Sequence, residues 1–213
     1  MKTADLLGLL AADTLPVPRQ AVPRQLALSL VAGLPLAAAV MLFGYGIRPD
    51  IGVALHWPMF WMKLLFPAVL CVAAFIVLQR LARPGVRPGA SWLGLAVPVL
   101  VLWGLAAALL GTAPPELRQA MVLGQTWRTC SLNIMLISMP VFVAVFAALG
   151  GSAPTRPAWT GACAGAMAGA AGAAVYALHC PELAAPFLAV WYVLGILLPV
   201  GAGALLGPRL LRW

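Results

Sequence analysis

The hydrophobic pattern of the chain consists of long apolar stretches separated by short polar segments. A helix needs about 20 apolar residues to cross roughly 30 Å of hydrocarbon, and six stretches approach or reach that length. They are Leu26–Gly44, Trp57–Leu78, Trp92–Gly111, Cys130–Leu149, Gly161–Leu178 and Ala185–Leu206. The pattern predicts an all-α integral membrane bundle of six transmembrane helices over residues 26–213, with residues 1–25 forming a separate N-terminal segment.

The composition supports this prediction and excludes several other classes of protein. Of the 213 residues, 63% are hydrophobic and only 8% are charged, whereas soluble domains average about a quarter charged residues. An ordinary soluble domain, a disordered chain and a secreted disulfide scaffold are therefore excluded. The net charge of +8 would suggest a nucleic-acid partner in a soluble protein, but in a membrane protein it reports topology.

The basic residues are divided unequally between the two sides that six spans create. Nine of them lie on the side of the two termini: Lys2, Arg19, Arg24, Arg80, Arg83, Arg87, Arg156, Arg209 and Arg212. Four lie on the other side: Arg48, Arg118, Arg128 and Lys63. Lys63 falls inside the second span, and we expect it to snorkel to the interface. Because basic residues are retained on the cytoplasmic side, both termini are predicted to be cytoplasmic, and no direct nucleic-acid contact is needed.

The six spans contain neither an acidic residue nor a catalytic signature. Coupled transporters usually place a carboxylate at mid-membrane, and the phosphate-loop, zinc-protease and nucleophile-elbow motifs are missing from the sequence. We therefore predict that the chain is not an enzyme. A small membrane transporter or channel for a metal ion, and a structural membrane subunit, remain as alternatives.

The fifth span differs from the others because it is dense in glycine and alanine. Gly161, Gly165 and Gly169 repeat at a spacing of four residues, which places small residues along one ridge and lets helix backbones approach closely. The ridge predicts either a central helix held by its neighbours or the face of a homodimer.

Two of the four cysteines are predicted to meet at the outer end of the bundle. Cys71 and Cys163 lie within spans and are interpreted as small apolar fillers. Cys130 begins the fourth span and Cys180 lies in the turn before the sixth. The residues expected near this pair are His179, His56, Glu182 and Asn133.

Three interpretations of the pair Cys130 and Cys180 stay open from the residues alone. The pair is incidental, or it forms a disulfide in an oxidising compartment, or it is a soft-metal or redox site. Thiolates and imidazole suit soft ions such as Cu(I) and Zn(II). We expect no constitutive cofactor and, in the third case, a transient soft metal ion.

The N-terminal segment contains a short apolar helix pattern over Ala4–Ala12. Its leucines, Leu6, Leu7, Leu9 and Leu10, form a stripe that can lie in the groove of a partner protein. Alternatively, such a helix rests on the membrane surface.

Three segments resemble the NrsF family of bacterial membrane proteins, whose name stands for negative regulator of sigma F. They are ADLLGLLAADTLPVP before the first span, TWRTCSLNIMLISMPVF at the head of the fourth, and HCPELAAPFLAVWYVLGILLPVGAGALLGPRLLRW at the end. The resemblance covers the full length and implies a six-helix protein of the bacterial inner membrane, with both termini inside.

The resemblance also implies a function and a partner. Members are anti-sigma factors that hold an extracytoplasmic-function sigma factor inactive and are associated with heavy-metal stress responses. Their two periplasmic cysteines are the sensing residues, which correspond to Cys130 and Cys180. The N-terminal leucines are then expected to dock the sigma factor.

Overall fold

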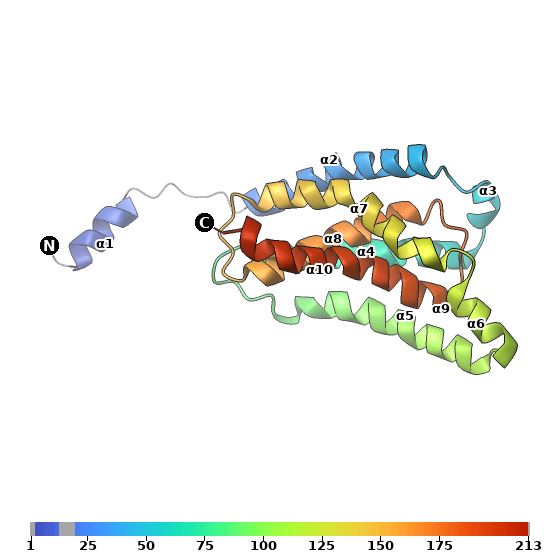
Figure 1. Cartoon of the computed structure of the whole chain (residues 1–213). Coiled ribbons are helices and arrows are strands. Elements are labelled where there is room, and N and C mark those ends of the chain that lie inside the picture. The colour runs from blue at the N-terminus through green and yellow to red at the C-terminus, as the bar shows by residue number, and fades with distance from the viewer. Residues whose placement is uncertain (1–2, 13–19, 213) are drawn as a thin grey trace.

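The computed structural model is helical (Figure 1) and describes residues 3–12 and 20–212. The helices in chain order are α1 (Thr3–Ala12), α2 (Ala21–Gly44), α3 (Ile51–Ala54), α4 (Pro58–Leu81), the 3₁₀ turn η1 (Gly89–Trp92), α5 (Leu93–Thr112), α6 (Pro115–Leu123), α7 (Trp127–Leu149), α8 (Pro157–Tyr176), α9 (Ala185–Phe187), the π-helical turn η2 (Leu188–Tyr192) and α10 (Val193–Leu210). In the described part of the chain, six helical stretches are long and apolar enough to cross a membrane. The predicted all-α bundle of six spans is thereby confirmed.

The helices extend beyond the predicted spans where the sequence is polar but still compatible with a helix. α2 begins at Ala21 rather than Leu26, because Pro23 is tolerated in a first helical turn, where its missing N–H has no partner anyway. A separate helix, α6, precedes the fourth span; it begins with a proline and ends at Leu123, before Gly124, whose φ of +55° suits glycine. The division of the chain at residue 25 stays a prediction.

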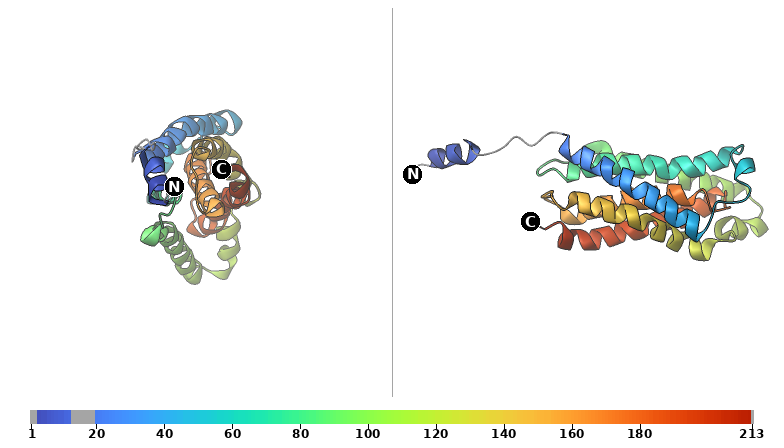
Figure 2. Two further views of the ribbon diagram at one scale, coloured as in Figure 1. Left: turned by 90° about the vertical axis from the view of Figure 1, so that its left-hand side faces the viewer. Right: turned by 90° about the horizontal axis from the view of Figure 1, so that it is seen from above.

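The long helices run side by side around α8, which is the most buried of them (Figure 2). α10, α4 and α7 surround α8, and α2 packs mainly on α7. The glycine ridge faces α10: a Cβ atom at Gly161 would strike the backbone of Gly203, and one at Gly165 would strike the backbone of Pro199. The ridge therefore serves the packing of α8 against α10 within one chain.

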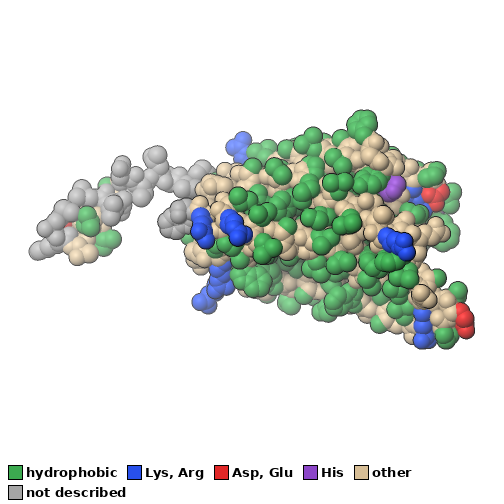
Figure 3. Space-filling view, viewed as in Figure 1, with side chains coloured by type: hydrophobic (Ala, Val, Ile, Leu, Met, Phe, Trp, Pro, Cys, Tyr) green, Lys and Arg blue, Asp and Glu red, His purple; other side chains and the backbone are tan. Residues whose placement is uncertain are grey.

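The charged residues lie near the two ends of the bundle (Figure 3). The end formed by the start of α2, the end of α4, the start of α8 and the end of α10 is called the basic end below. α1 stands clear of the bundle beyond this end in Figures 1 and 2. Within residues 20–212 the acidic residues, Asp50, Glu116 and Glu182, all belong to the opposite end. This segregation matches the division on which the predicted orientation rests.

Candidate functional site

The structure brings Cys130 and Cys180 into direct contact at the end opposite the basic end. Cys130 lies in the first turn of α7, and Cys180 lies in the loop between α8 and α9. Their side chains lie close enough to influence each other's protonation, both are fully buried, and both are free thiols. The pair forms the centre of the candidate site.

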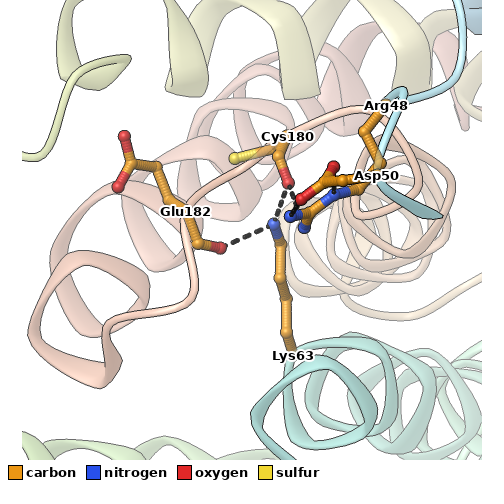
Figure 4. A network of polar contacts seen from close by, with 5 residues as sticks. All are labelled: Arg48, Asp50, Lys63, Cys180 and Glu182. Atoms are coloured by element: carbon orange, nitrogen blue, oxygen red, sulfur yellow. Dashed lines mark hydrogen bonds and ion pairs between the residues drawn. The ribbon is translucent and has the colours of Figure 1, made fainter. Parts of the chain in front are cut away.

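Lys63 of α4 holds the backbone of the Cys180 loop (Figure 4). Its ammonium donates to the carbonyl oxygen of Cys180 at 2.6 Å and to that of Glu182 at 2.8 Å, and it lies 5.4 Å from the ring centre of Tyr192. The expectation that Lys63 snorkels to the interface was wrong, because its side chain has 0% exposure. Burying a charge is costly unless it is hydrogen-bonded, and these two carbonyls supply the required partners.

Arg48 connects the loop between α2 and α3 to the same carbonyl oxygen of Cys180. Its guanidinium donates to both carboxylate oxygens of Asp50 at 2.7 Å and to the carbonyl oxygen of Cys180 at 3.3 Å. Its backbone N–H donates to the carbonyl oxygen of Leu178 at 3.2 Å. The hydrogen bond raises the pKa of Arg48 and lowers the pKa of Asp50, so this pair stays charged over a wide pH range.

The surroundings of Cys180 favour its thiolate form. The neighbouring Cys130 thiol and the positive charge of Lys63 lower the pKa of Cys180, although burial acts in the opposite direction. The thiolate is the form that attacks oxidants and binds metals. The pair therefore combines one activated sulfur with a neighbouring thiol.

Glu182 fastens the Cys180 loop to the start of α7. Its carboxylate accepts hydrogen bonds from the backbone N–H groups of Gln125, at 2.6 Å, and Thr126, at 3.3 Å. This is the favourable position for a negative charge at a helix N-terminus. A Cβ atom on Gly124 would lie 2.6 Å from a Glu182 carboxylate oxygen, so glycine at this position leaves room for the bond.

The predicted nitrogen and oxygen neighbours of the pair have other partners. His179 is hydrogen-bonded to the carbonyl of Gly46 at 2.9 Å, and the exposed His56 is bonded to Gly52 at 2.9 Å. Asn133 connects the hydroxyls of Tyr45 and Tyr176.

A metal site with histidine or carboxylate ligands is therefore not assembled around the thiols. Within residues 3–12 and 20–212, no group of three or more histidine, cysteine or acidic side chains could hold a metal ion. What the structure does bring together is the two sulfur atoms, which leaves a two-sulfur soft-metal site or a redox pair.

Comparison with known proteins assigns the chain to a family. The family model described as "Negative regulator of sigma F", NrsF, matches residues 10–213. The chain belongs to the NrsF family. It is 43% identical to the "Probable anti-sigma-F factor NrsF" of Azospira oryzae over 213 residues, which is 100% of both chains. It is 39% identical to the "Anti-sigma-F factor NrsF" of Caulobacter vibrioides over 217 residues, again 100% of both chains.

No solved structure shows a significant match to the chain. The NrsF family is one of regulators, which agrees with the prediction that the chain is not an enzyme.

Two cationic residues of the site in this NrsF chain were not foreseen from the sequence. Lys63 was treated as an interfacial anchor, and Arg48 as one of the few basic residues in the outer loops. One signal was present: an ionisable residue inside an apolar span is expensive and usually has a specific partner. The partners themselves, carbonyl oxygens far along the chain, carry no sequence signature.

The proposed docking leucines of this NrsF chain lie on α1. The side chains of Leu6 and Leu7 are 45% and 62% exposed, which leaves both available for contact. The side chains of Leu9 and Leu10 lie outside the described residues. Docking stays a prediction for all four.

Proposed function

We propose that this chain is an inner-membrane anti-sigma factor that sequesters an extracytoplasmic-function sigma factor and releases it when Cys130 and Cys180 react. The reacting species is a heavy metal or an oxidant on the periplasmic side. Membership of the NrsF family supports the regulatory role. The observation that carries the sensory role is the pair of neighbouring, fully buried free thiols.

The chemistry of the pair allows two kinds of signal. A soft metal ion replaces the thiol proton and bridges the two sulfurs, because thiolates prefer soft ions. An oxidant that accepts two electrons and two protons joins the sulfurs in a disulfide, which shortens their separation to about 2.05 Å. In either case Cys180 moves relative to Cys130, and the loop between α8 and α9 must follow.

The Cys180 loop connects the pair to most of the bundle. Arg48, Lys63 and Glu182 bind it to the α2–α3 loop, to α4 and to the start of α7. It continues into α9, η2 and α10, and a π-helical turn such as η2 is frequent at functional sites. A shift of this loop therefore changes the packing of α8 and α10, whose far ends lie at the basic end.

The sigma factor is proposed to bind α1 at that basic end. An exposed leucine stripe is the surface that an amphipathic helix inserts into a partner groove, and Leu6 and Leu7 are exposed. Releasing most of the bound sigma factor requires a difference in affinity of a few kcal/mol between the two states.

The proposal is tested by affinity purification of the tagged, full-length protein from membranes, before and after treatment with cadmium or a thiol oxidant. We expect a sigma factor to co-elute with the untreated protein and to leave after treatment. Cys130→Ser and Cys180→Ser should keep the sigma factor bound after treatment. Cys71→Ser and Cys163→Ser, which change cysteines outside the pair, should behave as the unaltered protein does.

A second set of variants separates docking from sensing. Leu6→Glu with Leu7→Glu should abolish co-elution even without treatment, because charges replace the apolar stripe. Normal release from both variants of the pair would refute the sensory role. Normal co-elution of the leucine variant would move docking to the loops of the basic end.

A further inference from the structure

Three neighbouring hollows, called the groove below, lie between the basic end and the membrane-spanning part of the bundle. Its inner part, about 230 Å³, lies between α5 on one side and α8 and α10 on the other, with Leu70 of α4 at its base. Its lining is apolar and includes Leu95, Val99, Ala166 and Ile196. The groove exists because α5 packs mainly against α4 and α9 and stands away from α8 and α10 along this length.

Two tryptophans mark the mouth of the groove. Trp92 and Trp159 pack edge to face with their ring centres 5.7 Å apart, and both also line an adjoining hollow of about 260 Å³. That hollow shares Pro88 and Arg156 with a third, of about 330 Å³, which adds Arg87. The three hollows are thus neighbours, each sharing lining residues with the next, and they run from the two arginines to the apolar interior.

The arginines at this path have charge available for a ligand. Neither the guanidinium of Arg87 nor that of Arg156 has a hydrogen bond or an ion pair with a residue in the described part of the chain. Arg80, in contrast, donates to the carbonyl oxygen of Pro88 at 2.9 Å. Because the acidic residues within positions 20–212 all lie at the opposite end, this mouth is positively charged and favours an anion.

We propose that an anionic phospholipid occupies this groove, with its phosphate between Arg87 and Arg156 and an acyl chain between α5 and the α8–α10 pair. Guanidinium groups bind phosphate oxygens through paired hydrogen bonds, and basic pockets between membrane helices hold anionic headgroups. The tryptophans lie at the level where aromatic residues meet the membrane interface.

The apolar part of the groove favours a lipid over other anions. A free phosphate would use the arginines but leave the inner hollow unfilled, and unfilled apolar space forfeits dispersion contacts. An acidic protein segment would have to place unpaired backbone polar groups among hydrocarbon, which is costly. A phospholipid supplies both the charge and the apolar chain.

The test is native mass spectrometry of the purified full-length protein in detergent, with phosphatidylglycerol or phosphatidylcholine of identical acyl chains. We expect one phosphatidylglycerol to be retained and phosphatidylcholine to be lost. Arg87→Gln combined with Arg156→Gln should weaken retention by about fivefold for each arginine. The matched control is Arg118→Gln combined with Arg128→Gln, which removes two exposed charges at the other end and should leave retention unchanged.

A second variant tests the acyl-chain part of the proposal without changing charge. Ala162→Phe places a ring in the inner hollow, which Ala162 lines, and should also lower retention. Equal retention of the two lipids, or equal losses in the two double variants, would overturn the proposal. Displacement of the lipid by inorganic phosphate, with no effect of Ala162→Phe, would assign the arginines to a free anion instead. If Arg87→Gln combined with Arg156→Gln abolished sigma-factor binding but left lipid retention unchanged, the two arginines would bind a protein partner. This result would also overturn the phospholipid proposal.

Discussion

At the scale of single residues, the candidate site depends on how Lys63 is satisfied. A buried ammonium must find hydrogen-bond acceptors, and here the acceptors are backbone carbonyls of a loop rather than a carboxylate. The result is a loop whose position is set by one side chain of α4, and a positive charge beside the Cys180 sulfur. Lys63 thereby acts as a positioning residue for the thiol pair.

Replacing Lys63 by methionine should destabilise the protein and change the acidity of Cys180. Methionine keeps the apolar stem but leaves the Glu182 carbonyl without its donor, which costs about 1–3 kcal/mol. We expect the free energy of unfolding in detergent to fall by about 2 kcal/mol. Arg128→Gln, at an exposed residue over the Trp127 ring, serves as the control and should change it by less than about 0.5 kcal/mol.

A titration of thiolate ultraviolet absorbance gives a readout that lost packing alone would not move. In a background of Cys71→Ser and Cys163→Ser, the thiolate of Cys180 should persist below the ordinary thiol pKa of about 8.5. Its lowered pKa contributes stability above the unfolded value, and this contribution disappears as the pH falls through the folded value. Lys63→Met should move the transition upward; an unchanged transition would contradict the role of the ammonium.

At the scale of elements, the contact between α8 and α10 is made by backbone against backbone. Gly161, Gly165 and Gly169 on α8 meet Gly203, Pro199 and Ile196 on α10, and at each position a Cβ atom would meet the opposite backbone. Without a hydrophobic driving force between helices in lipid, such close approach supplies the van der Waals contact that holds them together.

Two glycines of α10 provide a matched test of this packing. A Cβ atom at Gly203 would overlap the backbone of Gly161, whereas one at Gly201 meets nothing within 4 Å. Gly203→Ala should therefore lower the free energy of unfolding by about 1–3 kcal/mol through overpacking. Gly201→Ala should be neutral or stabilising by about 0.5–1 kcal/mol, since alanine favours a helix interior. If Gly203→Ala and Gly201→Ala changed thermal unfolding equally, the close contact between α8 and α10 would not contribute to the stability of the protein.

At the scale of the whole molecule, the unequal charge of the two ends sets the expected orientation. Basic residues gather at the end from which α1 projects, and the acidic residues within positions 20–212 lie at the other. The positive-inside rule predicts that the basic end lies in the cytoplasm, where the proposed sigma factor would be present, and that the thiol pair lies in the periplasm.

Reporter fusions test this orientation directly. A fluorescent protein fused after residue 85 or after residue 212 should fluoresce, because both points belong to the basic end. Alkaline phosphatase fused after residue 113, between α5 and α6, should be active because it is exported. The reverse pattern would place the cysteines in the cytoplasm and contradict the sensing of a periplasmic signal.

The spans and their number follow from local composition, because a chain in hydrocarbon must satisfy its own backbone hydrogen bonds and so forms helices wherever it is apolar for long enough. The alternation of sides then puts Cys130 and Cys180 at one end without further information.

The partners of the polar side chains, in contrast, do not follow from local composition. Lys63 meets the Cys180 carbonyl across 117 positions of sequence, and Glu182 turns to α7 instead of the thiols. The packing of α10 on the glycine ridge of α8 is likewise not encoded in the hydrophobic pattern of either helix. Such contacts depend on which helices become neighbours and on how loops fold between them, and no local periodicity encodes either.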